Sequence, residues 1–132
     1  MVEVAVDIVT ESAADLEALD VLVQIDAPDG RLFEGVASLR ASDSAGIATL
    51  MVEIPDPERW WPRGLGEQPL HDVRVAMRRD GVVLDEASRR VGLRVVALDT
   101  GKDPEGARFR FVVNGEPIFC RGANWIPDGL FP

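Results

Sequence analysis

Three tryptophans offer the largest side-chain faces for binding a ligand in this sequence. Trp60 and Trp61 are adjacent and precede Pro62, and Trp125 lies near the end. An indole face of this size can stack on a sugar ring, whereas its burial inside a protein contributes about 1.5–3 kcal/mol or more. Adjacent residues of an extended chain point in different directions, which disfavours one flat platform. We therefore expect Trp60 and Trp61 to plug one end of the fold or its contact with a neighbouring domain.

The other side chains that could act as nucleophile, acid or metal ligand are isolated in the sequence. Glu105 and Glu116 flank turns, and we expect neither to be catalytic. Cys120 is the one cysteine, which excludes an internal disulfide, and after Phe119 we interpret it as a small buried or half-buried hydrophobe rather than a nucleophile. His71 has no second ligand at a metal-binding spacing. The sequence thus predicts no catalytic residue, no metal site and no cofactor.

The composition is typical of one soluble domain with an extension. The chain has 132 residues, of which 46% are hydrophobic and 28% charged, and no apolar run approaches the length of about 20 residues that a membrane-spanning helix needs. A net charge of -9 argues against a nucleic acid or an anionic membrane as partner. The first residues alternate and carry no basic region, so nothing resembles an export signal and we expect a cytoplasmic protein.

Seven short runs with apolar residues at alternate positions indicate strands that are buried on one face. Turn formers separate the runs about every ten residues, and no stretch is a convincing helix. This pattern predicts an all-β fold, an immunoglobulin-like antiparallel β-sandwich of about seven strands without the disulfide of antibody domains. The expected strands are 2–9, 21–25, 31–40, 47–54, 70–79, a run that begins at 82–84, and 91–98.

Short turn motifs fix several of the connections. Pro28 and Gly30 predict a tight turn over residues 27–30, and Asp80-Gly81 predicts a hairpin. Residues 41–46 are small and polar, and we interpret them as a loop. Gly92 is a candidate β-bulge within the last run.

A polar stretch rich in turn formers divides the chain. We expect a sandwich over 1–99, a linker over 100–106 and a β-hairpin extension from 107, turned by Asn114-Gly115. A lone hairpin is marginally stable, so this one must pack on the sandwich or on another domain. The sequence ends on an apolar segment, which we interpret as a piece of a longer protein. Its side chains could also form a dimer: Trp125, Ile126, Leu130 and Phe131.

Two motifs carry a resemblance to a known family. The first is the run from Trp60 to Leu70, with the pattern Trp60, Trp61, Pro62, Gly64, Gly66, Gln68 and Pro69. The second runs from Phe111 to Pro127, and Arg90–Arg94 adds a shorter element. Together they resemble the β-mannosidase branch of the glycoside hydrolase family that also contains β-galactosidases and β-glucuronidases. His71 stands where that family often has tyrosine, and Leu93 where phenylalanine is usual.

The resemblance implies a place in a larger enzyme. In that family an N-terminal jelly roll precedes the sandwich, and a catalytic (β/α)₈ barrel follows it, so residues 107–132 would be the hairpin and the first strand of a truncated barrel. The family's two catalytic glutamates, which hydrolyse terminal β-mannosides with retention, lie deeper in the barrel and outside this sequence. By the same resemblance, Asn124 and Trp125 would line the sugar pocket of the parent enzyme.

Three functions remain open on the sequence. The favoured one is a non-catalytic structural sandwich, itself inactive, that packs against the barrel and the jelly roll of the parent. The second is a carbohydrate-binding module that uses Trp60, Trp61 and Trp125. The third is a sandwich that pairs with another protein through an exposed apolar patch.

Overall fold

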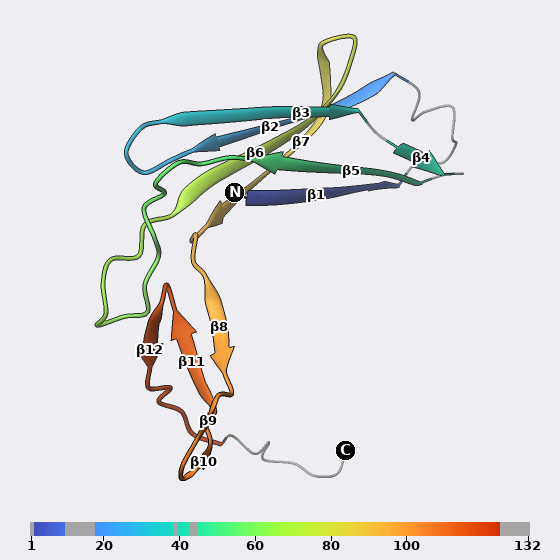
Figure 1. Cartoon of the computed structure of the whole chain (residues 1–132). Helices are drawn as coiled ribbons and strands as arrows, with labels where there is room; N and C mark the ends of the chain where they lie inside the picture. Colours follow the sequence, from blue (N-terminus) through green and yellow to red (C-terminus); the bar gives the residue numbers. More distant parts are fainter. Residues whose placement is uncertain (1, 10–17, 39, 43–44, 125–132) are drawn as a thin grey trace, which may run out of the picture. The chain divides into compact units, whose positions relative to one another are not determined.

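Every regular element in the described part of the chain is a β-strand, and all paired strands are antiparallel. The computed structural model describes residues 2–9, 18–38, 40–42 and 45–124. The chain forms two compact units, Met1–Leu93 and Arg94–Pro132 (Figure 1). The prediction of an all-β antiparallel sandwich is confirmed.

One sheet of the first unit contains β1 (Val2–Val9), β5 (Ala45–Val52) and β4 (Arg40–Ser42) in the order β1-β5-β4. The expected loop at 41–46 is therefore wrong, because its first residues pair with its last ones, Ala41 with Gly46 and Ser42 with Ala45. Small polar residues have weak strand propensity, but pairing along a neighbouring strand overrides that preference.

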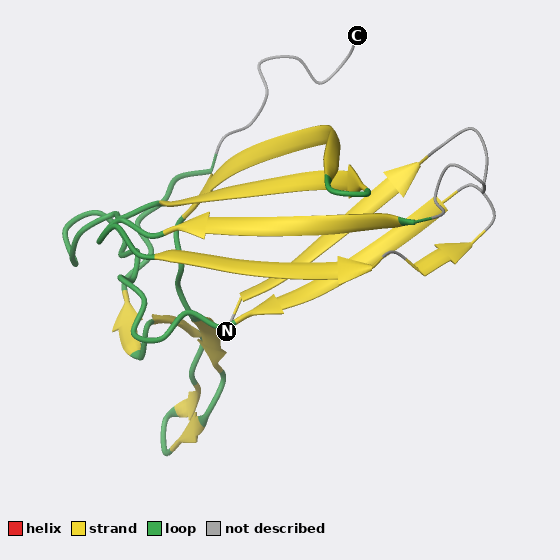
Figure 2. Cartoon of the chain, turned by 90° about the horizontal axis from the view of Figure 1, so that it is seen from above, coloured by secondary structure: helices red, strands yellow, loops and turns green. Residues whose placement is uncertain are grey.

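The other sheet of the first unit contains β2 (Leu19–Asp26), β3 (Leu32–Ser38), β6 (His71–Arg79) and β7 (Val82–Val91) in the order β3-β2-β6-β7. Figure 2 shows two sets of strands that run at an angle to one another. β2 lies inside its sheet, and its residues alternate between buried and half-buried along the whole strand. This is the period of two that its sequence predicts.

The core lies between the two sheets. Alternate residues of β2 and β5 point into it, and each fully buried aliphatic side chain contributes about 1.5–3 kcal/mol. Half-buried valines of β1 and β6 pack against its margin. The core side chains are Val21, Val23, Ile25, Ala48, Leu50, Val52 and Ile54.

The predicted turns of the first unit are present, but the predicted bulge is elsewhere. Asp80 and Gly81 have φ angles of 51° and 81°, as the type I′ hairpin between β6 and β7 requires. Residues 27–30 form a tight turn in which the Gly30 N–H donates to the Ala27 carbonyl at 2.9 Å. Gly92 follows the end of β7 and is not a bulge, whereas the β6–β7 register shifts between Met77 and Arg78.

The second unit contains a sheet of β8 (Val96–Asp99), β11 (Arg110–Val113) and β12 (Glu116–Ile118) in the order β12-β11-β8. The run 91–98 was expected to close the sandwich, and this expectation is wrong, because its second half forms β8 and pairs with β11. Alternation shows that a segment is a strand but not which sheet it joins. Asn114 and Gly115, with φ angles of 52° and 93°, make the predicted hairpin turn between β11 and β12.

The stretch expected as a linker contains a short ribbon of β9 (Lys102–Asp103) and β10 (Gly106–Ala107). The Asp99 carboxylate holds the entry to this ribbon, accepting the Gly101 N–H at 2.9 Å and Arg110 Nε at 2.7 Å. The hydrogen bond from the Gly101 backbone is the largest cause that lowers the pKa of Asp99, and the bond from Arg110 adds to it. The assignment of 107–132 to the start of a barrel stays a prediction.

Candidate functional site

The candidate site is residues 55–70, the part of the connection between β5 and β6 that follows Ile54, and we call it the tryptophan loop. Arg31, at the turn between β2 and β3, fixes its start by donating from Nη1 to the Pro55 carbonyl at 2.9 Å and from Nη2 to the Asp56 carbonyl at 3.2 Å. Arg31 is itself held by an ion pair with Asp29 at 2.6 Å. The loop therefore leaves the core in a defined direction.

Trp60 lies against the backbone that follows β7. Its N–H donates to the Leu93 carbonyl at 2.8 Å. A Cβ added to Gly92 would lie 2.7 Å from Cγ and Cδ1 of the Trp60 ring, closer than atoms pack in proteins. Only a residue without a side chain lets this ring approach the backbone so closely. The glycine thus joins the loop to the end of the last sandwich strand.

Trp61 closes the loop on itself. Its N–H donates to the Glu67 carbonyl at 2.9 Å, and Gln68 Nε2 donates to its carbonyl at 3.1 Å. Its ring covers Gly66, where an added Cβ would lie 2.8 Å from Cγ and Cδ1. Between Trp61 and Gly66, the Leu65 N–H donates to the carbonyl of Pro62 at 3.0 Å, which makes a tight turn.

The two indole rings therefore have separate environments. Both are half-buried, Trp60 on Gly92 and Trp61 on Gly66. Gly64 takes a φ of 89°, a conformation that favours glycine, and Pro69 is half-buried where the loop returns to β6. The structure brings these motif residues into one closed loop, in which each tryptophan ring packs on a different glycine.

The residues predicted for the sugar pocket of a parent enzyme stand apart from this loop in the sequence. Asn124 is exposed and is the last described residue, and Trp125 lies outside the described residues. The same holds for Ile126, Leu130 and Phe131, which together with Trp125 were expected to be able to form a dimer. The interpretation of Cys120 is wrong: the residue is exposed, because β12 ends at Ile118 and Phe119 is 87% exposed.

His71 is the polar residue that sequence reasoning did not place. It is fully buried, and neither Nδ1 nor Nε2 has a hydrogen-bond partner. Burial is the main cause that lowers the pKa of His71, and the carboxylates of Asp29 and Glu58 oppose it. The sequence contains a signal for this burial, because His71 is two residues before Val73 and four before Val75, the inward-facing residues of β6.

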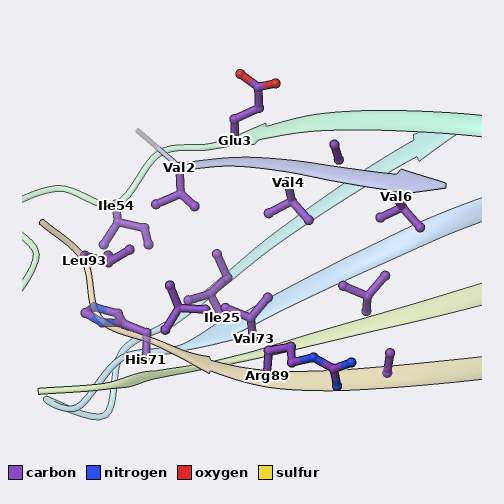
Figure 3. Close-up of a pocket in the computed structure, with 14 residues that line it drawn as sticks. Val2, Glu3, Val4, Val6, Ile25, Ile54, His71, Val73, Arg89 and Leu93 are labelled. Atoms are coloured by element: carbon purple, nitrogen blue, oxygen red, sulfur yellow. The ribbon is translucent and has the colours of Figure 1, made fainter. Parts of the chain in front are cut away.

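A cavity of about 480 Å³ lies at one margin of the sandwich. Figure 3 shows Val2, Val4 and Val6 of β1 on one side of it, with His71 and Arg89 on the opposite side. Its wall is almost entirely aliphatic. An apolar wall of this kind offers packing surface and few groups that could orient a polar substrate.

Two further observations concern the described residues. Nowhere in 2–9, 18–38, 40–42 and 45–124 do three side chains of His, Cys, Asp or Glu gather as a metal site would require. Within the same ranges there is no helix long and apolar enough to cross a membrane.

Similarity to known proteins follows the architecture described above. Residues 1–94 match the family model described as Glycosyl hydrolases family 2. Beta-mannosidase B of Aspergillus terreus is 33% identical over 98 residues, which are 74% of this chain and 12% of that protein. A probable beta-mannosidase of Caenorhabditis elegans is 43% identical over 94 residues, which are 67% of this chain and 10% of that protein.

A solved structure extends the match over both units. The crystal structure of beta-D-mannosidase from Dictyoglomus thermophilum aligns with 95% of this chain and 15% of its own, with a TM-score of 0.74 and 30% sequence identity. The chain thus spans 10% to 12% of the length of the two curated relatives. Because the family model matches well over half of its residues, the chain belongs to glycosyl hydrolase family 2.

Proposed function

We propose that this chain is a structural, non-catalytic domain of a longer β-mannosidase-like hydrolase that acts on terminal β-mannosides with retention. Its relatives named as beta-mannosidases are several times longer, which leaves room for other domains in a parent polypeptide. The resemblance assigns those domains as a catalytic barrel and an N-terminal jelly roll. The observation that carries the proposal is the closed tryptophan loop.

The loop is built as a fixed surface rather than as a ligand pocket. The ring of Trp60 packs on Gly92 and that of Trp61 on Gly66, within the chain itself. A sugar platform would instead need ring faces that converge on one open space. Two side chains of the same loop, Leu65 at 54% and Leu70 at 37%, are exposed and offer apolar contact to a neighbouring domain.

Glu105 precedes the proposed barrel segment and Glu116 lies within it, and neither has the surroundings of a catalytic carboxyl group. Glu105 and Glu116 are both exposed, and Glu116 opens the short strand β12. A retaining glycosidase holds two carboxyl groups about 5–5.5 Å apart on either side of the scissile bond, in surroundings that keep one of them protonated. Exposed carboxylates have no such surroundings, which supports the assignment of catalysis to the deeper part of the barrel, outside this sequence.

The purified chain tests the proposal directly. It should not hydrolyse an aryl β-mannoside above the rate in buffer, while a full-length β-mannosidase of the family, assayed beside it, should. Clear turnover by a preparation free of contaminating hydrolase would contradict the proposal. Carbohydrate binding is tested in the same sample: tryptophan emission should stay unchanged as manno-oligosaccharides are added to high concentration, and a saturable change would favour a binding module.

A further inference from the structure

The strand order of the sandwich shows an unfilled position next to β1. In an immunoglobulin sandwich, strands A, B, E and D form one sheet, and C, F and G form the other. The sheet β3-β2-β6-β7 corresponds to C′, C, F and G, and the sheet β1-β5-β4 corresponds to B, E and D. The position of strand A, on the side of β1 away from β5, holds no strand among the described residues.

β7 shows the consequence of this arrangement. In the immunoglobulin order, strand A faces strand G across the sandwich, and β7 is in the position of G. All 10 residues of β7 are exposed, although β6 beside it alternates toward the core in its first half. No strand in the part of the chain that the structure describes therefore covers the side chains of β7 that should point inward.

The cavity coincides with the same position. β1 contributes half-buried Val2, Val4 and Val6, and β7 contributes Ala87 and Val91, to one aliphatic space of about 480 Å³ (Figure 3). Protein interiors are close-packed and hold few voids larger than a water molecule. An opening of this size between two sheets indicates that side chains from another segment complete the core here.

The backbone of β1 is suited to receive that segment. Within the described ranges, β1 pairs with β5 alone, so the N–H and C=O groups along its other side have no strand partner. A free edge of this kind is a template for another strand. A strand that paired there would place every second side chain over the cavity, because side chains alternate between the two faces of a sheet.

We propose that an extended segment preceding β1 in the longer polypeptide pairs with this free edge and inserts alternate apolar side chains between β1 and β7. Strand A precedes strand B in the immunoglobulin order, and most of the length of the relatives lies outside the matched region. The segment has about five to six residues, the usual length of a strand. The inference holds whether or not the parent is a hydrolase.

Hydrogen exchange of residues 2–9 tests the proposal in the natural protein. Backbone N–H groups of β1 that face its free edge should exchange at least about tenfold more slowly in the full-length parent than in this chain, because a strand bond protects them. Amides of β2, which is paired on both sides, serve as the internal control and should differ little. Equal exchange of β1 in the two proteins would overturn the proposal.

A fusion separates strand pairing from cover by another domain. About six residues of alternating valine and threonine are joined before residue 1 through a short glycine-rich turn, and a control fusion carries the same residues with the valines contiguous. The alternating fusion should raise the thermal midpoint by about 4–8 °C and protect β1, and the control should do neither. The proposal would be contradicted if the control fusion raised the thermal midpoint by the same amount, or if neither fusion raised it.

Two variants of the alternating fusion locate the effect. Ala87→Trp fills the cavity from the β7 side and should remove the gain in midpoint. Ile47→Trp places the same ring on the exposed face of β5 and should leave the gain intact. If the chain without a fusion already sediments as a dimer with β1 protected, a second copy occupies the edge and the proposal is wrong.

Discussion

Substituting Gly92 with alanine should break the contact that joins the tryptophan loop to the end of β7. The new Cβ would lie 2.7 Å from Cγ and Cδ1 of Trp60 and 2.9 Å from its Cβ. A change of rotamer would move Cγ and Cδ1 but not the Cβ of Trp60, so the contact at 2.9 Å would remain without a shift of the backbone. The backbone of Trp60 is also fixed, because its N–H donates to the carbonyl of Leu93, the residue next to the substitution.

The expected loss of stability follows from this geometry. Forcing an extra methyl group into a packed contact costs about 1–3 kcal/mol. The Trp60 ring could instead be displaced into water. The protein would then lose a fraction of the roughly 1.5–3 kcal/mol that full burial of a large side chain contributes, because this ring is only half-buried. Either route lowers the free energy of unfolding by about 1–3 kcal/mol.

Urea unfolding followed by tryptophan emission measures the loss. A Trp125→Phe background leaves Trp60 and Trp61 as the only tryptophans, so the signal reports on the first unit. Gly92→Ala should lower the urea midpoint without changing the slope, and emission of the native state should shift to the red. Gly122→Ala is the matched control, because an added Cβ there meets nothing within 4 Å, and it should change the free energy by less than about 0.5 kcal/mol.

A double-mutant cycle assigns the loss to the ring. In a Trp60→Ala background the Cγ and Cδ1 atoms that lie 2.7 Å from the new Cβ are absent, so Gly92→Ala should cost clearly less than it does beside tryptophan. An equal cost in the two backgrounds would refute the contact as the cause. A Gly92→Ala variant with the stability and emission of the parent chain would refute the geometry itself.

Three further substitutions test other parts of the fold. Gly66→Ala should cost about 1–3 kcal/mol in the same urea assay by clashing with Trp61, and no loss would contradict the closed loop. Arg31→Met should cost less than about 1 kcal/mol, because its bonds to Pro55 and Asp56 are exposed, and faster loop proteolysis should accompany it. His71→Phe should gain about 1 kcal/mol at pH 7 by removing unpaired buried nitrogens. The pKa of His71 in the folded protein is lowered from 6.5, so the free energy of unfolding should be highest above about pH 6.5 and should fall as the pH drops through the folded pKa. The phenylalanine variant should lack this dependence of the free energy of unfolding on pH between pH 7 and 5.

Local patterns in the sequence predicted the strands and most turns. Alternation located β1, β2 and β6, and the Asp80-Gly81 pair located the hairpin that precedes β7. These features depend on residues close in sequence, since strand period and turn conformation are set locally.

Features that depend on distant residues were not predictable in this way. The pairing of β8 with β11 rather than with the sandwich is decided by strand partners, and the contact of Gly92 with Trp60 joins residues far apart in the chain. Gly92 was therefore interpreted as a bulge, although its lack of a side chain serves ring packing. The exposure of Cys120 likewise follows from where β12 ends, which its hydrophobic neighbours do not show.

We propose that the tryptophan loop holds the domain together and does not bind substrate. Kinetics of a full-length family member that carries this domain with Trp60→Leu test it most directly. If the loop is structural, the substitution should lower the thermal midpoint by about 2–4 °C for each kcal/mol of stability lost, the shift typical of larger domains. The KM for an aryl β-mannoside should stay unchanged. A raised KM with an unchanged thermal midpoint would contradict it, because the ring would then contribute to substrate binding.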